Sequence, residues 1–472
     1  MTKAQNRFSV EAVDKRLLMS ATLFSSAGLN KGTYNTIQEA IDAAADGAGD
    51  VVEIASGTYQ ENLVINKTDL TIRPGSGQNV VIDAQNIPVP GKGPANGTVA
   101  ITVQSDDVKI DGNGSKDDGS LTITDAAVGV QADGVKNLDV TDTQFTDLNN
   151  TQPGVIRGIY LNGDGADFAE IYRNTFGVTV GTGIDVNGGD SSQIQMNTFN
   201  SVDVGVQLRN DADGNNVRQN NQNGGATFAT TDGTSSNTFA KNIVKGAETG
   251  FHLQSDSNLV GGAHPSEGNM VNDAFNAFVI GGDFNQVQYN LISTDNMDRA
   301  ANVPNSVGFL VNGDTNNFTA NTVRFAERAF QVWGENNTFV QNLALSGTSS
   351  TAIGFDIQSP AGNTQLGFNV AQGGLIGFEV TADDAILEQN IASDAGTGIA
   401  VEGDNAAVTR NVAFGNGVGL AVGSATQAVV GGQDSADELT QQIQANFSLP
   451  GSNATGFANG GLSNFVGFNF FG

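Results

Sequence analysis

The sequence predicts an all-β fold, a solenoid in which short parallel strands stack coil upon coil. One observation behind this prediction is a Gly-apolar-x-apolar unit that recurs from residue 158 to residue 422, with its glycine returning every 21 residues in the last coils. The other is a column of asparagines in step with that unit, from Asn174 to Asn411. A repeat of this length indicates units that cannot bury an apolar face alone and therefore stack on one another.

Each column has a physical reason. Alternate residues of a strand point the same way, so pairs such as Phe309 and Val311 are expected to point inward as continuous apolar ladders. The glycine before each pair is expected at a corner, where it accepts a tight backbone. Asparagine tolerates the left-handed conformation and bonds to nearby backbone, so the asparagine column predicts a ladder of amides at another corner.

The segment before the repeat has a different character. Ile37, Ala40, Ile41 and Ala44 have helical spacing. The following stretch VVEIASGTYQENLVINKTDLTIRP, residues 51–74, consists of short β-rich runs between turn residues. This order of elements resembles the opening of the pectin-lyase-like superfamily, which includes the pectin methylesterases. The resemblance implies a single-stranded right-handed parallel β-helix with a short N-terminal capping helix.

Three divisions of the chain follow. Residues 1–30 are expected to be a targeting-like or disordered segment, residues 31–430 the β-helix, and residues 431–472 a C-terminal cap containing a short helix over 437–446. The stretch FSVEAVDKRLLMSA, residues 8–21, partly resembles the LEPR-XLL motif of large exported surface proteins. It implies an extracellular or cell-surface location, and the alternative interpretation is an ordinary frayed terminus.

Composition excludes several classes of protein. The net charge is −29, which repels polyanions, so we expect no nucleic-acid partner. The absence of cysteine excludes disulfides, thiol nucleophiles and cysteine-bound zinc, and two histidines cannot build a histidine-rich metal site. No run of 18 apolar residues is present, so no transmembrane span is expected.

The same alternation predicts a polar strip on the outer face of the strands that follow the glycine column. A linear sugar chain could lie along this strip, with amides and carboxylates meeting hydroxyl groups and the single tryptophan stacking on a ring. The alternative is a solvated sheet surface without a ligand. The predicted substrate-binding residues are Asp185, Asn187, Gln207, Arg209, His252, Gln331, Trp333, Asp356, Gln358 and Glu379.

Two groups are candidates for catalysis. Asp356 and Glu379 are expected on adjacent coils in one outward row, about 5–6 Å apart, which is near the separation in retaining glycoside hydrolases. Arg324, Glu327 and Arg328 form a charged turn beside an insertion after Asn290, and arginine can neutralise the uronate carboxylates of a lyase substrate. The alternative is a set of surface acids and salt bridges that pin a loop.

Metal binding has one weak signal. Asp211 and Asp213 lie in an acidic turn with alternating oxygen ligands, like the start of a Ca²⁺ loop, but no glutamate follows at the required distance. Ca²⁺ is therefore the one cofactor considered. The catalytic motifs of pectin methylesterases, polygalacturonases and alginate epimerases are absent, so the resemblance transfers a fold and no catalytic residue.

The functional hypothesis is an exported β-helix protein that binds polysaccharide or has a structural role at the cell surface, with self-association through an uncovered coil end. The alternative is an enzyme that cleaves or modifies polysaccharide, as a lyase, glycoside hydrolase or epimerase. A third hypothesis is a module of a larger adhesin.

Overall fold

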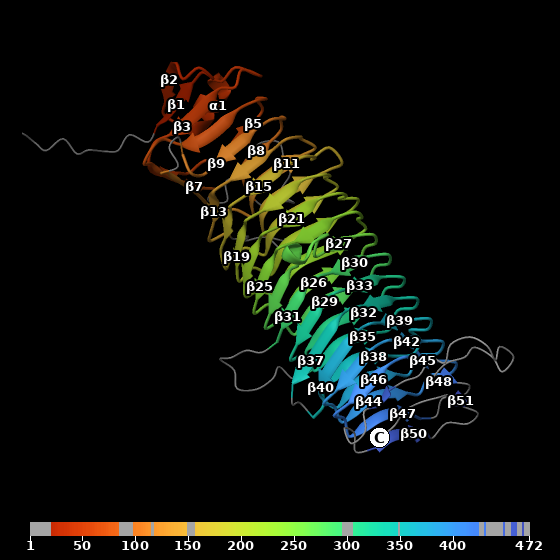
Figure 1. Ribbon diagram of the computed structural model, residues 1–472. Coiled ribbons are helices and arrows are strands. Elements are labelled where there is room, and N and C mark those ends of the chain that lie inside the picture. The colour runs from red at the N-terminus through yellow and green to blue at the C-terminus, as the bar shows by residue number, and fades with distance from the viewer. Residues whose placement is uncertain are drawn as a thin grey trace, which may run out of the picture.

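The computed structural model describes residues 20–84, 98–114, 118–148, 156–294, 305–347 and 350–423, and four short strands beyond them. The chain winds as a right-handed parallel β-helix, in which each coil contributes one strand to each of three long sheets (Figure 1). The predicted fold is confirmed. The proposed export motif and the 437–446 helix lie outside the described residues.

Sheet A begins with two antiparallel pairings, β2 on β1 and β1 on β3, and is parallel from β3 onward. Its strands are β1 (Ala21–Phe24), β2 (Asn30–Tyr34), β3 (Val51–Ile54), β6 (Thr71–Pro74), β9 (Lys109–Asp111), β12 (Asp139–Thr141), β15 (Glu170–Tyr172), β18 (Gln193–Gln195), β21 (Asn216–Arg218), β24 (Thr238–Ala240), β27 (Leu259–Val260), β30 (Gln286–Gln288), β33 (Asn317–Thr319), β36 (Thr338–Val340), β39 (Gln365–Gly367), β42 (Ile386–Glu388), β45 (Ala407–Thr409), β48 (Val429–Val430) and β51 (Phe465–Val466).

Sheet B is parallel throughout its described strands. They are β4 (Gly57–Tyr59), β7 (Asn79–Asp83), β10 (Ser120–Thr124), β13 (Thr143–Phe145), β16 (Thr175–Phe176), β19 (Thr198–Asn200), β22 (Asn221–Asn223), β25 (Ile243–Lys245), β28 (Met270–Asn272), β31 (Leu291–Ser293), β34 (Thr322–Arg324), β37 (Leu343–Gly347), β40 (Val370–Gly373), β43 (Ile391–Ser393), β46 (Val412–Phe414) and β49 (Phe447–Ser448).

Sheet C is also parallel and carries the predicted outward strip. Its strands are β5 (Leu63–Ile65), β8 (Val99–Val103), β11 (Val128–Asp133), β14 (Arg157–Asn162), β17 (Thr182–Asn187), β20 (Val204–Arg209), β23 (Thr227–Asp232), β26 (Thr249–Leu253), β29 (Asn276–Ile280), β32 (Val307–Val311), β35 (Arg328–Val332), β38 (Ile353–Ile357), β41 (Ile376–Val380), β44 (Thr397–Val401), β47 (Val418–Val422) and β50 (Thr455–Asn459).

The N-terminal end of the solenoid is covered. Helix α1 (Ile37–Ala43) buries Ile37, Ala40 and Ile41, and Thr36 caps it by accepting a hydrogen bond from the backbone N–H of Glu39. The helix lies with β1, β2 and β3 over the first coil (Figure 1). At the other end, β48 to β51 pair in parallel with the coils before them.

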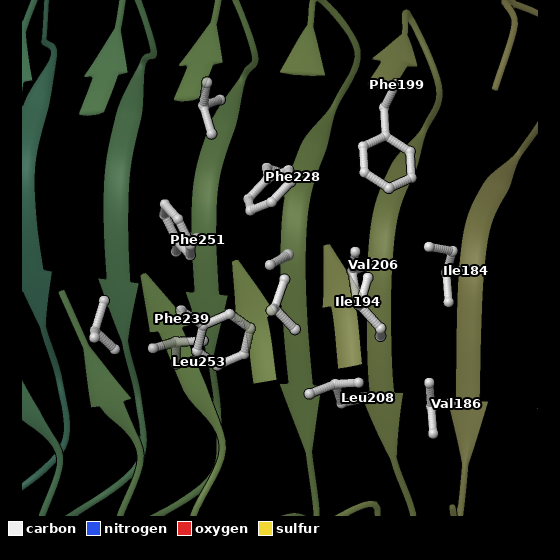
Figure 2. Close-up of a cluster of buried hydrophobic side chains, with 14 of the residues drawn as sticks. Ile184, Val186, Ile194, Phe199, Val206, Leu208, Phe228, Phe239, Phe251 and Leu253 are labelled. Carbon is white, nitrogen blue, oxygen red and sulfur yellow. The ribbon is translucent and has the colours of Figure 1, made fainter. Parts of the chain in front are cut away.

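The core is a tube of apolar side chains that point inward from all three sheets (Figure 2). Phenylalanines on successive coils stack face to face, as in the run from Phe251 through Phe278 and Phe309 to Phe330, with ring centroids 4.7–5.1 Å apart. That separation matches the spacing of strands in a sheet, so the coil repeat sets the ring stacking.

The asparagine column forms the predicted amide ladder. Asn220, for example, donates from Nδ2 to the carbonyl of Ile194 (2.8 Å) and to Oδ1 of Asn242 (3.1 Å), and its own Oδ1 accepts from the backbone N–H of Asn197 (2.9 Å). A second ladder of buried amides, including Asn215, Asn237 and Asn258, follows the corner between sheets C and A and was not predicted.

The predicted position of the glycine column is wrong. Gly158 and Gly183 lie inside strands β14 and β17, without the positive φ of a corner residue. A Cβ on Gly158 would lie 2.4 Å from the ring of Phe176 and 2.6 Å from the carbonyl oxygen of Gly183. Close packing of sheet C over the phenylalanine of sheet B therefore requires the glycine.

Candidate functional site

The candidate site is the outer face of sheet C. Register places the predicted outward residues in rows, since Gln331 pairs with Asp356 and Asp356 pairs with Glu379. These side chains do not form a uniformly solvated strip. Several of them belong to two clusters, one on β35 to β41 and the other on β14 to β20.

The Asp356 cluster comprises Arg328, Trp333, Asp356, Gln358 and Glu379. Asp356 is only 1% exposed although it points away from the core. Nε of Arg328 donates to its Oδ2 at 2.8 Å, and Nε2 of Gln358 donates to its Oδ1. Both carboxylate oxygens therefore have a donor, which offsets the desolvation of a buried charge.

Glu379 has unusual electrostatics. Burial raises the pKa of Glu379, and the charges of Asp356 and Glu402 raise it further, while the guanidinium of Arg328 opposes them. Desolvation is the larger cause, and the charge of Asp356 is the next largest. Glu379 is the group in this cluster best suited to hold a proton.

Trp333 lies at the edge of the Asp356 cluster. It follows β35 directly, and its backbone N–H donates to the carbonyl of Val311 at 2.8 Å, which fixes it to the preceding coil. Its side chain is 40% exposed. Gln358 occupies the equivalent position on the next coil, so register places the aromatic residue next to the strand that carries Asp356 and Gln358.

The Asp185 cluster comprises Arg157, Tyr160, Asp185, Asn187 and Arg209. Asp185 is fully buried between the two arginines, with Nε of Arg157 at 2.5 Å and Nε of Arg209 at 2.9 Å. The guanidinium of Arg157 lies 4.5 Å from the centroid of the Tyr160 ring, and Nδ2 of Asn187 lies 3.2 Å from the Tyr160 hydroxyl. Arg209 has a raised pKa because Asp185 accepts hydrogen bonds from it.

The two clusters repeat one arrangement. In each, an arginine on the first residue of a sheet C strand reaches an aspartate on the next coil, Arg157 to Asp185 and Arg328 to Asp356. Arg157 was missed in the sequence because alternation was counted from the glycine onward, whereas this arginine precedes Gly158.

The remaining predicted residues are distributed around these clusters. Gln207 and Gln331 are half-buried between neighbours in the same row, and Nε2 of His252 lies 2.9 Å from Nε2 of Gln254. Arg324 ends β34 with an exposed side chain, and Glu327 accepts from the backbone N–H of Asn305 at 2.5 Å. The insertion expected to accompany them falls largely on residues 295–304, outside the described residues.

The predicted calcium residues have structural partners. Oδ1 of Asp213 accepts from the backbone N–H of Ser235 at 2.5 Å, and the Asp213 N–H donates to Oδ1 of Asp190 at 2.8 Å. Asp211 is exposed nearby. Among the described residues, no group of three or more His, Cys, Asp or Glu side chains could hold a metal ion.

Comparison with known proteins supports the fold more than any activity. No family model matches the chain. A probable pectinesterase/pectinesterase inhibitor of Arabidopsis thaliana is 34% identical over 82 residues, which is 16% of this chain and 16% of that protein. The match therefore spans about a sixth of the plant protein.

Several solved structures are similar in winding. A tailspike protein of E. coli bacteriophage HK620, in complex with a pentasaccharide, is 14% identical and matches 91% of this chain and 76% of its own, with a TM-score of 0.46. A periplasmic alginate epimerase is 11% identical, and the match covers 100% of this chain and 99% of the epimerase, with a TM-score of 0.24. The catalytic unit of an α-1,3-glucanase from Streptomyces thermodiastaticus is 13% identical, and the match covers 92% of this chain and 66% of the glucanase, with a TM-score of 0.33.

None of these proteins supplies a catalytic residue to this chain, because sequence identity is too low to carry a side chain over. Over the described residues, none of the helices has the length and apolar character needed to cross a membrane.

Proposed function

We propose that this protein binds a polysaccharide of uncharged sugars along the outer face of sheet C, with the Asp356 cluster as the main binding site. The observation that carries the proposal is Trp333, an exposed aromatic ring beside a hydrogen-bonded group of amide and carboxylate side chains. Sugar rings present an apolar face for stacking and hydroxyl groups at their edges, and this arrangement offers a partner for each.

Net charge narrows the ligand class. A chain of −29 repels a polyanion such as polygalacturonate at long range, whereas a neutral polysaccharide approaches without that penalty. The sheet C strands repeat about every 4.8 Å, so equivalent side chains on several coils can meet several sugars of one extended chain. Export to the cell surface belongs to the same proposal, since the partly matching motif at residues 8–21 is typical of exported proteins.

The test is binding of a panel of soluble neutral polysaccharides (galactomannan, xyloglucan and mixed-linkage glucan), with polygalacturonate for comparison, by affinity electrophoresis and calorimetry. Trp333→Ala is expected to weaken binding roughly fivefold, because one stacked ring contributes on the order of 1 kcal/mol. Phe368→Ala is the matched control, since Phe368 is 53% exposed at a corner between sheets A and B. Equal effects of the two substitutions, or no binding to any polymer, would contradict the proposal.

A second candidate function is acid-catalysed hydrolysis of the bound glycan. Glu379 has a raised pKa, as a proton donor requires, and Glu402 is one of the charges that raises it. Glu379 pairs with Ala400 in register, so Glu402 lies two residues further along the next coil. A second carboxylate there would be the general base that activates water in an inverting glycoside hydrolase.

Hydrolysis is tested by assaying new reducing ends after incubation with each polymer that binds. Glu379→Gln is expected to abolish hydrolysis and to leave binding within a few-fold, whereas Trp333→Ala weakens both. An absence of new reducing ends with a polymer that binds tightly would leave a binding protein and reject the enzyme.

A further inference from the structure

One outward row of sheet B is apolar at seven of eight successive coils, with Thr322 as the exception. The first residue of each strand from β25 to β46 pairs in register with the next, beginning with Ile243, Met270 and Leu291 and ending with Val370, Ile391 and Val412. We call this row the sheet B stripe. Ile243, Met270 and Ile391 are 38%, 38% and 37% exposed, so the stripe faces solvent.

The fold itself does not require an apolar row here. In the preceding coils the same register position is held by Thr175, Thr198 and Asn221, and the strands pair equally well. An apolar residue on an outer face gains nothing from the core, and a row of seven of them interrupted only by Thr322 is typical of a surface that another molecule covers.

Charged side chains are rare on the same face. The eight strands from β25 to β46 contain no aspartate or glutamate, although acids make up 50 of the 472 residues. The only charged residues in these strands are Lys245 and Arg324. The sheet A strands from β18 to β39 also lack aspartate and glutamate, whereas the outer face of sheet C carries Glu379. Sheet B differs from both in combining a lack of acids with an apolar row, so two acidic chains can approach each other over it with little charge repulsion.

The size of the face suits a dimer. Seven strand spacings of about 4.8 Å give a length of about 34 Å. The width is roughly 20 Å once the apolar corner residues Phe275, Phe325 and Leu375 beside the stripe are included, because a three-residue strand alone spans about 10 Å. The product, roughly 700 Å², is close to the ~800 Å² that each partner buries in a stable interface.

We infer that the sheet B stripe is the contact surface of a homodimer, in which a second copy of this chain lies antiparallel alongside the first. A twofold axis perpendicular to the solenoid passes between Thr322 and Leu343, at the middle of the stripe. It places Met270 of one copy opposite Ile391 of the other. β25, β31, β37 and β40 lie along one side of the solenoid, so the contact leaves the outer face of sheet C open (Figure 1).

The first experiment is sedimentation velocity of the full chain over a range from about 0.1 to 100 μM. A dimer is expected, and Met270→Glu is expected to raise its dissociation constant at least roughly 100-fold, because symmetry buries two new carboxylates, each opposite Ile391 of the other copy and without a charged partner. Ile386→Glu is the matched control, since Ile386 is 42% exposed on sheet A. It is expected to leave the dissociation constant within a few-fold.

The second experiment uses the absence of native cysteine. Met270→Cys and Ile391→Cys chains are prepared separately, mixed and oxidised. The antiparallel dimer predicts a disulfide between the two different chains and little cross-linking of either chain alone.

Three results would overturn the inference. One is a chain that stays monomeric at 100 μM. Another is a dimer that Met270→Glu does not weaken, or in which Met270→Cys chains cross-link to themselves. The third is a monomer that binds uncharged phosphatidylcholine vesicles through the stripe, which would assign this face to a lipid surface. None of these results depends on whether the chain binds glycan.

Discussion

Gln222 is a polar residue in the apolar tube, and replacing it should stabilise the protein. It points inward from β22, in register between Phe199 and Val244, and its side chain is 0% exposed. Neither its amide nitrogen nor its amide oxygen has a hydrogen-bond partner among the described residues. A buried amide without partners costs about 1–3 kcal/mol relative to an apolar group of the same shape.

Gln222→Met keeps the length of the unbranched side chain and removes both polar atoms. We expect the free energy of opening the coil to rise by about 2 kcal/mol, the middle of that range. Because each coil of a solenoid contacts only its neighbours, the effect should be local rather than spread over the chain. Hydrogen exchange of β22 and of the strands next to it should slow by roughly 30-fold, since 1.4 kcal/mol corresponds to a factor of ten.

The assay is hydrogen exchange followed by mass spectrometry, with peptides resolved coil by coil. Gln195→Met is the control, because Gln195 is partly exposed and its amide already donates to Gln193 at 2.9 Å. Faster exchange around β22 in Gln222→Met, or no change, would refute the reasoning, since it would mean that the amide is satisfied where it lies.

Three further predictions concern charge and hydrogen bonding. Burial and the charge of Glu170 raise the pKa of Asp139 to about 6, so the folded state binds this proton more tightly than the unfolded state. The stability of the protein therefore falls as pH rises from about 4 to about 6. Asp139→Asn should raise the thermal midpoint at pH 8 and leave it unchanged at about pH 3. Asn220→Ala should destabilise its own and the adjacent coils by roughly 3 kcal/mol, because it leaves several buried groups of the amide ladder unpaired, as hydrogen exchange would show. Asp185→Ala should cost about 1–3 kcal/mol in denaturant unfolding, because two partly buried arginines lose their shared counter-ion.

Matched substitutions separate these effects from general damage. Asn223→Ala changes an exposed asparagine near the ladder, and it should change the free energy of opening measured by hydrogen exchange by less than about 0.5 kcal/mol. Asp211→Ala removes an exposed acid, and it should change the free energy of unfolding by a similarly small amount. A pH-independent gain from Asp139→Asn would contradict the linkage argument. Equal losses at Asn220 and Asn223, or at Asp185 and Asp211, would contradict the role given to burial.

The parts of the fold that the sequence predicted correctly depend on identical residues at regular spacing. The first amide ladder has asparagine at every described coil from Asn174 to Asn411, so its column can be recognised in the sequence alone. The second ladder changes residue type, from Ser192 through Asn215 to Thr364, because a hydroxyl can close the same corner as an amide. Without an invariant residue, spacing alone did not reveal it.

For the candidate site, alternation predicts which side chains point outward but not their surroundings. Alternation correctly directed Asp185 and Asp356 outward, yet it could not show that neighbouring side chains bury them. That burial depends on Arg157 and Arg328, which reach across to the next coil, and a contact between side chains 28 residues apart in the chain leaves no local pattern. The glycine column shows the same limit, because its reason is a phenylalanine on another sheet.

The spacing of the first amide ladder shows where this chain tolerates change. Successive ladder bonds join asparagines 21 to 31 residues apart, yet the bonds from Nδ2 to Oδ1 across intervals of 21, 27 and 31 residues are all 2.9 Å long. The extra residues of the longer coils form turns at the corners between sheets, such as the 3-10 turn η2 (Pro265–Glu267) between β27 and β28. Foreign peptides inserted at such corners should therefore be displayed at fixed heights along a rod, which suits the molecule to use as a molecular ruler.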